Sequence, residues 1–171
     1  MEQAPDFLIF LCFGKGSAMR IYVDADACPV KEIIVKLAKQ FSVQVIMVSD
    51  TSHELRDGYS TIQTVDKSRD SADLAIINQV QCGDIVVTQD YGVAAMALAK
   101  NCHPIHQNGM LYTAQNMDRL LFERHLGQKM RRSGKKTHGN RKRTAEDNRA
   151  FEKALFALLG SLCGFRKDGQ T

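Results

Sequence analysis

Short apolar runs alternate with segments of helical periodicity along most of the chain. Runs of strand length, rich in β-branched residues, occupy 20–23, 43–49, 60–65 and 84–89, and a shorter one spans 103–106. Between them apolar residues recur at helical spacing, as in VKEIIVKLAKQF and GVAAMALAKN. Apolar strands joined by helices indicate a parallel sheet that is covered on both faces. The pattern therefore predicts an α/β fold with three layers.

The last third of the chain is predicted to be helical around a basic segment. Helical periodicity resumes at Thr113, and residues 129–143 then contain eight Lys or Arg and no acid. Because the net charge is only +4, the rest of the chain is slightly acidic. Thr144 and Asp147 match a capping box at the start of a final helix. We predict an extension over 1–18, an α/β domain over 19–128, and a basic segment with a helix over 129–171.

Composition places the chain among cytoplasmic globular proteins. A length of 171 residues with 44% hydrophobic residues suits one domain with a real core. The five cysteines are scattered without a CxxC pair, which is typical of a reducing compartment. The apolar run FLIFLCF at 7–13 is too short to span a bilayer, and MEQAPD before it lacks the basic residues of a signal peptide. We therefore expect no membrane association.

Acidic residues gather where the predicted strands end. In open parallel sheets, ligands bind beyond the carboxyl ends of the strands. The first strand ends in a DxD motif, an acid follows the fourth strand, and two acids open the helix after the third. These residues are Asp24, Asp26, Asp70, Asp73 and Asp90. The cations interleaved with them in the sequence are Lys67 and Arg69.

Carboxylates packed together repel one another unless a cation lies among them. The cation that suits oxygen ligands is Mg²⁺ or Mn²⁺, and such sites cleave phosphodiester bonds with a metal-activated water. We predict all five aspartates as metal ligands, and the catalytic residues as Asp24, Asp26, Asp73 and Asp90. A simpler interpretation stays open for Asp70, Asp73 and Asp90. Each of them could have no role beyond capping a helix or interacting favourably with the helix dipole. Cys28, beside the DxD motif, is interpreted as a packing residue.

The basic residues indicate a nucleic-acid partner. A nuclease needs cations for the phosphates that flank the scissile bond, besides a metal for the bond itself. The candidates are Lys67, Arg69, Arg131, Arg132, Lys135, Lys136, Arg141, Lys142 and Arg143. The alternative reading of residues 129–143 is a solvated loop without a ligand.

Several motifs in this order resemble the YaiI/YqxD family of uncharacterised bacterial proteins. They are VDADACPVK, DSADLAI, GDIVVTQDYGVA, NGMLYTAQNM, and RRSGKKTHG followed by AEDNRAFEKAL, and together they cover about 19–159. That family is similar in turn to PIN-like domains, which are metal-dependent ribonucleases with a parallel sheet in the order 3-2-1-4-5. The resemblance implies that Asp24, Asp73 and Asp90 bind metal, with Asp26 and Asp70 as additional carboxylates. It also favours RNA over DNA as the substrate.

Three functions are compatible with these features. The first is a Mg²⁺- or Mn²⁺-dependent ribonuclease. The second is a phosphatase of the haloacid-dehalogenase type with Asp24 as the nucleophile, but this class expects a threonine where the chain has Cys28. The third is an RNA-binding module without catalytic activity.

Overall fold

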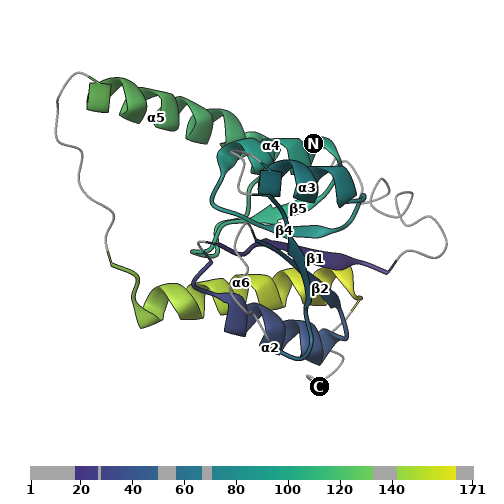
Figure 1. Cartoon of the computed structure of the whole chain (residues 1–171). Helices are drawn as coiled ribbons and strands as arrows, with labels where there is room; N and C mark the ends of the chain where they lie inside the picture. The colour runs from purple at the N-terminus through teal and green to yellow at the C-terminus, as the bar shows by residue number, and fades with distance from the viewer. Residues whose placement is uncertain (1–17, 27, 50–56, 67–70, 133–141, 165–171) are drawn as a thin grey trace, which may run out of the picture.

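One sheet of parallel strands forms the centre of the protein (Figure 1). The computed structural model describes residues 18–26, 28–49, 57–66, 71–132 and 142–164. Within them the strand order is β3-β2-β1-β4-β5, which confirms the predicted fold class and strand order. The strands are β1 (Arg20–Asp24), β2 (Gln44–Ser49), β3 (Thr61–Thr64), β4 (Ile85–Val87) and β5 (His103–Ile105).

β1 lies in the middle of the sheet and is buried on both faces. Ile21, Tyr22 and Val23 are fully buried. Ile21 and Val23 pack into one core cluster and Tyr22 into the other, because successive side chains of a strand point to opposite faces. This double burial explains why the strand sequence is apolar without alternation.

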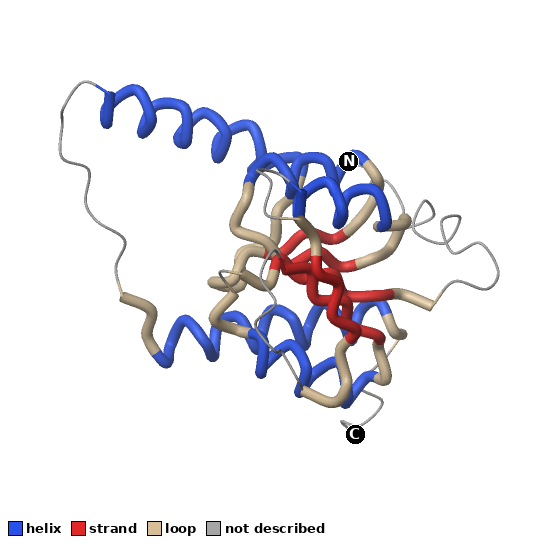
Figure 2. The backbone as a smooth tube through the Cα atoms, in the orientation of Figure 1, coloured by secondary structure: helices blue, strands red, loops and turns tan. Residues whose placement is uncertain are grey.

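Helices cover both faces of the sheet, which gives the predicted three layers (Figure 2). One face carries α2 (Lys31–Phe41) and α6 (Ala145–Leu162). The other carries α3 (Ser71–Gln79) and α4 (Tyr91–Ala99), and α5 (Ala114–Arg132) lies on α4 and projects beyond the sheet (Figure 1). In the described part of the chain, no helix is both long and apolar enough to cross a membrane.

The final helix belongs to the same core as the strands. Phe151, Leu155 and Leu159 of α6 are fully buried among residues of β1, β2 and α2. The predicted capping box is confirmed: the Asp147 amide donates to Thr144 Oγ1 at 3.3 Å, and the Thr144 amide donates to Asp147 Oδ2 at 2.8 Å. α6 therefore starts at a defined residue and buries its apolar face.

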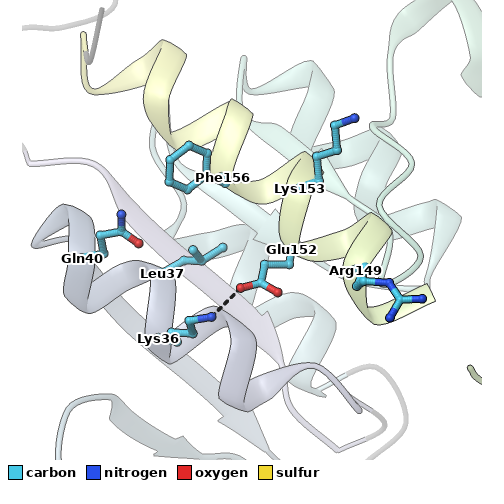
Figure 3. A pocket seen from close by; sticks show the side chains of 7 residues that line it. All are labelled: Lys36, Leu37, Gln40, Arg149, Glu152, Lys153 and Phe156. Carbon is cyan, nitrogen blue, oxygen red and sulfur yellow. Dashed lines mark hydrogen bonds and ion pairs between the residues drawn. The ribbon is translucent and has the colours of Figure 1, made fainter. Parts of the chain in front are cut away.

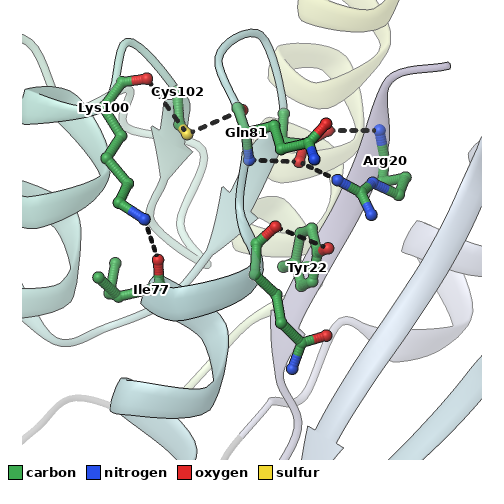
Figure 4. Close-up of polar contacts among 8 residues, drawn as sticks. Arg20, Tyr22, Ile77, Gln81, Lys100 and Cys102 are labelled. Atoms are coloured by element: carbon green, nitrogen blue, oxygen red, sulfur yellow. Dashed lines mark hydrogen bonds and ion pairs between the residues drawn. The ribbon is translucent and has the colours of Figure 1, made fainter. Parts of the chain in front are cut away.

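Polar contacts fix the amino edge of the sheet (Figure 4). The Arg20 amide donates to Asp84 Oδ1 at 2.9 Å, and the Arg20 guanidinium lies 3.2 Å from Asp84 Oδ2. The Gln81 amide donates to the same Oδ2 at 2.8 Å. Asp84 is only 2% exposed, so these three bonds offset the cost of burying its charge. They tie the start of β1 to the start of β4.

The role of α6 in the core can be tested with Leu155→Ala. The truncated side chain leaves a cavity in a fully buried position, so we expect a loss of about 2–5 kcal/mol in the free energy of unfolding, measured by urea titration. Leu126→Ala is the matched control, because Leu126 is 46% exposed on α5, and it should change stability by less than about 0.5 kcal/mol. Equal effects would show that α6 does not contribute to the core.

Candidate functional site

The candidate site lies at the carboxyl edge of the sheet, which we define as the turns that follow the strands. β1 pairs with β2 on one side and with β4 on the other, so the strand order reverses between β1 and β4. Loops leaving such a reversal point diverge and open a crevice, which is where parallel sheets bind ligands. Asp24 ends β1, and Asp90 precedes α4 just after β4. The two acids therefore flank the reversal point.

The turn after β1 holds two acids and is tied to its surroundings on both sides. Asp24 is half-buried and Asp26 is exposed. The buried hydroxyl of Ser49, at the end of β2, donates to Asp26 Oδ1. On the other side Lys31 Nζ donates to the Ala25 carbonyl at 2.7 Å, between the two acids in the chain. The turn is thus held by one neutral donor and one cation.

Asp90 is a helix cap, as the simpler interpretation allowed. Its Oδ1 accepts hydrogen bonds from the amides of Gly92 at 2.6 Å and Val93 at 3.2 Å. Its Oδ2 lies 3.5 Å from an Arg124 nitrogen, and the same guanidinium lies over the Tyr91 ring at 5.8 Å from the centroid. Both oxygens of Asp90 therefore have partners within the protein.

The described part of the edge contains cations that the sequence analysis did not name. Lys67 and Arg69 were expected to be the cations interleaved with the acids, and both lie outside the described residues. Among the described residues, Lys31 of α2 reaches the Ala25 carbonyl in the β1 turn, and Arg124 of α5 reaches Asp90. The order of residues along the chain does not reveal these contacts.

The structure brings four of the five predicted acids to one edge, but the described residues do not form a metal site. Asp73 lies in the first turn of α3 and is half-buried, and Asp70 lies outside the described residues. Among the described residues, no three or more His, Cys, Asp or Glu side chains are grouped so that they could hold a metal ion. Metal binding by the five aspartates stays a prediction.

Cys28 packs against the core beneath the β1 turn. Its side chain is 4% exposed and belongs to the cluster between the sheet and α2. Burial raises the pKa of the thiol to about 11, although Lys31 and Arg143 act in the opposite direction. A thiol with this pKa is protonated at neutral pH and is a poor nucleophile. The packing interpretation of Cys28 is confirmed.

A second polar network, which the sequence did not indicate, lies after β5. Gln107 is 1% exposed, and its Oε1 accepts from the Gln89 side chain. The Gln107 carbonyl accepts from an Arg143 nitrogen at 2.7 Å, and Arg143 Nε donates to Asn148 Oδ1 at 2.6 Å. Arg143, predicted to bind nucleic acid, thus joins the start of α6 to the carboxyl edge. The sequence feature that could have indicated this contact is the position of Arg143 directly before Thr144, the capping residue of α6.

The other predicted nucleic-acid contacts are described only in part. Lys142 is exposed. Arg131 and Arg132 end α5, and their side chains lie outside the description. The remaining residues of the set fall outside the described ranges: Lys67, Arg69, Lys135, Lys136 and Arg141.

The fold and the site define a class: an α/β protein with one parallel sheet and acids at its strand-order reversal. The family model described as "Uncharacterized BCR, YaiI/YqxD family" matches residues 22–161, and the chain belongs to this family. The resemblance to this family is therefore confirmed, whereas the relation to PIN-like domains stays a prediction. No solved structure gives a significant match.

Curated relatives match nearly all of their own length. A "UPF0178 protein" of Ruminiclostridium cellulolyticum is 63% identical over 141 residues, which is 82% of this chain and 92% of the relative. A "UPF0178 protein" of Alkaliphilus oremlandii is 57% identical over 141 residues, or 82% and 91% of the two chains. One from Lachnoclostridium phytofermentans is 52% identical over 147 residues, or 84% and 99%. These names state no activity.

The capping role of Asp90 can be separated from its charge by two substitutions. Asp90→Ala removes the acceptor for two amides of α4, so we expect a loss of about 1 kcal/mol in the free energy of unfolding. Asp90→Asn keeps an acceptor and should stay within about 0.5 kcal/mol of the wild type, because the exposed ion pair with Arg124 contributes little. Thermal and urea unfolding measure both. An equal loss in the two variants would assign the effect to the ion pair.

Thiol labelling tests the burial of the cysteines. At pH 8 Cys28 and Cys102 should resist iodoacetamide, because burial raises their pKa values to about 11 and about 12 and blocks access. Cys163 is exposed and should be modified faster than either of them. Peptide mass spectrometry gives the rate at each position, and the unfolded chain in guanidinium chloride is the control, where the rates should converge. Fast modification of native Cys28 would contradict the structure.

Proposed function

We propose that this protein is a divalent-metal-dependent hydrolase that cleaves phosphodiester bonds in RNA at the carboxyl edge of its sheet. The observation that carries the proposal is the pair Asp24 and Asp26, which a buried central strand delivers to the point where the strand order reverses. Parallel sheets bind ligands at such a point. Two carboxylates placed there together supply the oxygen ligands that a hard divalent ion prefers, which supports a ligand-binding role.

The donor set favours Mg²⁺ or Mn²⁺. Both ions prefer carboxylate oxygens, and when bound they supply an activated water and stabilise the leaving oxygen. Asp24 and Asp26 would contribute from β1, and Asp73 from the first turn of α3. Asp90 Oδ2 makes only a long contact with Arg124, so it retains acceptor capacity. The described acids do not complete a metal site by themselves, and the proposal includes Asp70.

RNA is the proposed substrate because cations surround the acidic turn. Lys31 lies beside it, and Arg143 fixes the start of α6 at the same edge. Residues 129–143 contain eight Lys or Arg, and the last of them, Arg143, lies at this edge. Phosphate groups release counterions when they bind such cations, which provides affinity independent of sequence.

A second candidate is an RNA-binding module without catalytic activity. The observation that favours it is the Arg124–Asp90 pair. The Arg124 guanidinium lies beside Asp90 Oδ2, where a metal ion bound to Asp90 would lie. In that case side-chain cations and neutral donors would hold the acids without a metal ion.

Metal-dependent cleavage of a labelled single-stranded RNA distinguishes the two candidates. We expect cleavage with Mg²⁺ or Mn²⁺, none after chelation with EDTA, and a loss of at least about 100-fold in rate for Asp24→Asn. Asp118→Asn is the matched control, because Asp118 is an exposed acid on α5. It should cleave at the wild-type rate.

The contrary outcomes are equally specific. RNA that stays intact with both metals, at the same level as with Asp24→Asn, would exclude the hydrolase. If that RNA still binds the protein with an affinity that falls with salt, the binding module is the correct candidate.

A further inference from the structure

A groove of about 360 Å³ runs between α2 and α6 on the face of the sheet opposite α3 and α4 (Figure 3). The two helices run in the same direction: Lys36 Nζ lies 2.6 Å from Glu152 Oε1, and further along the Phe41 and Phe156 ring centroids are 5.3 Å apart. α2 begins just after the β1 turn, and α6 begins where Arg143 bonds the Gln107 carbonyl. The groove therefore leads away from the carboxyl edge.

The groove is cationic. Lys36 from α2 and Arg149 and Lys153 from α6 line it, against one acid, Glu152. The Lys36–Glu152 pair is exposed, with side chains 68% and 36% accessible, so it is weak and can exchange for another anion. Arg149 and Lys153 form no ion pair with another described residue, and Figure 3 shows both extending away from Glu152. The groove thus offers positive charge that no described residue neutralises by an ion pair.

The groove is also partly apolar. Leu37 is buried, and Phe156 exposes 37% of its surface although one edge packs on Phe41. Successive cations beside an aromatic ring form the arrangement that binds single-stranded nucleic acid, in which phosphates meet the cations and a base contacts the ring. Arg149 and Lys153 lie one helical turn apart, about 6 Å between Cβ atoms, which is comparable to the distance between neighbouring phosphates.

We propose that the α2–α6 groove binds a single-stranded segment of nucleic acid that extends from the carboxyl edge. The inference rests on the proposed function for the nature of the ligand, and it adds a binding surface that the predicted basic residues do not include. Arg149 and Lys153 contact phosphates, and Phe156 contacts a base.

Binding is tested without cleavage, in EDTA, by the fluorescence anisotropy of a labelled oligouridylate with the full chain. Arg149→Glu should weaken binding about fivefold and lower the slope of log affinity against log salt by about 0.7. Lys39→Glu is the matched control on α2: it makes the same charge change, but Lys39 Nζ lies over the Tyr59 ring, 5.6 Å from its centroid, and does not line the groove. It should bind within about twofold of the wild type.

A second variant tests the aromatic contact. Phe156→Leu keeps an apolar side chain and the charges but removes the ring, so it should weaken binding about threefold without changing the salt slope. An oligonucleotide that contains 2-aminopurine should show less quenching with this variant than with the wild type. Circular dichroism of each variant checks that the helices are intact.

The contrary results separate this inference from the proposed function. Equal losses for Arg149→Glu and Lys39→Glu, or an oligoglutamate that competes as well as the RNA, would overturn the groove as a nucleic-acid site. If Arg149→Glu binds and cleaves like the wild type, the groove is excluded and the hydrolase stands. If no variant cleaves but binding depends on Arg149, the groove stands and the hydrolase is excluded.

Discussion

The burial of β1 on both faces is the constraint on which the rest of the structure depends. Ile21, Tyr22 and Val23 each lose all contact with solvent, two toward α2 and α6 and one toward α3 and α4. A strand so placed can carry charge only at its ends. At the amino end Arg20 meets that requirement with Asp84, which also locks β1 to β4. At the carboxyl end, Asp24 and Asp26 therefore lie at the edge of the sheet, outside the buried part of the strand.

The acids at that edge could be neutralised in two ways, by side-chain cations or by a divalent metal ion. The Arg124–Asp90 contact is 3.5 Å long between side chains that are 40% and 35% exposed, so it contributes about 0–1 kcal/mol. A divalent ion held by two or more carboxylates would exceed this attraction and displace the guanidinium. Lys31 is different, because the described hydrogen bond of its ammonium is with the Ala25 carbonyl and not with a carboxylate. The side-chain cations are thus compatible with a metal site without replacing it.

Patterns within single segments of the sequence predicted most of the fold. Contacts between segments that are distant in the sequence could not be predicted from these patterns. The apolar runs gave the strands, Thr144 and Asp147 gave the start of α6, and family resemblance supplied the strand order. The position of Asp24 at a strand end was predictable for the same local reason. The approach of Arg124 to Asp90 depends on how α5 packs on α4, which no sequence spacing encodes. The same holds for Arg143 and Gln107, whose contact spans 36 residues.

The position of α6 explains how binding and chemistry could be divided within one small domain. Phe151, Leu155 and Leu159 anchor α6 in the core, so the cations on its outer side are held by a rigid element. The acids instead lie at the ends of elements, where Ser49 donates to Asp26 and the amides of α4 donate to Asp90. Arg143 connects the two regions because it donates to the Gln107 carbonyl at the carboxyl edge and to Asn148 in the first turn of α6. A polyanion lying in the α2–α6 groove would therefore approach the acids from a fixed direction, which positions a phosphodiester at the strand ends without requiring the turn itself to supply the affinity.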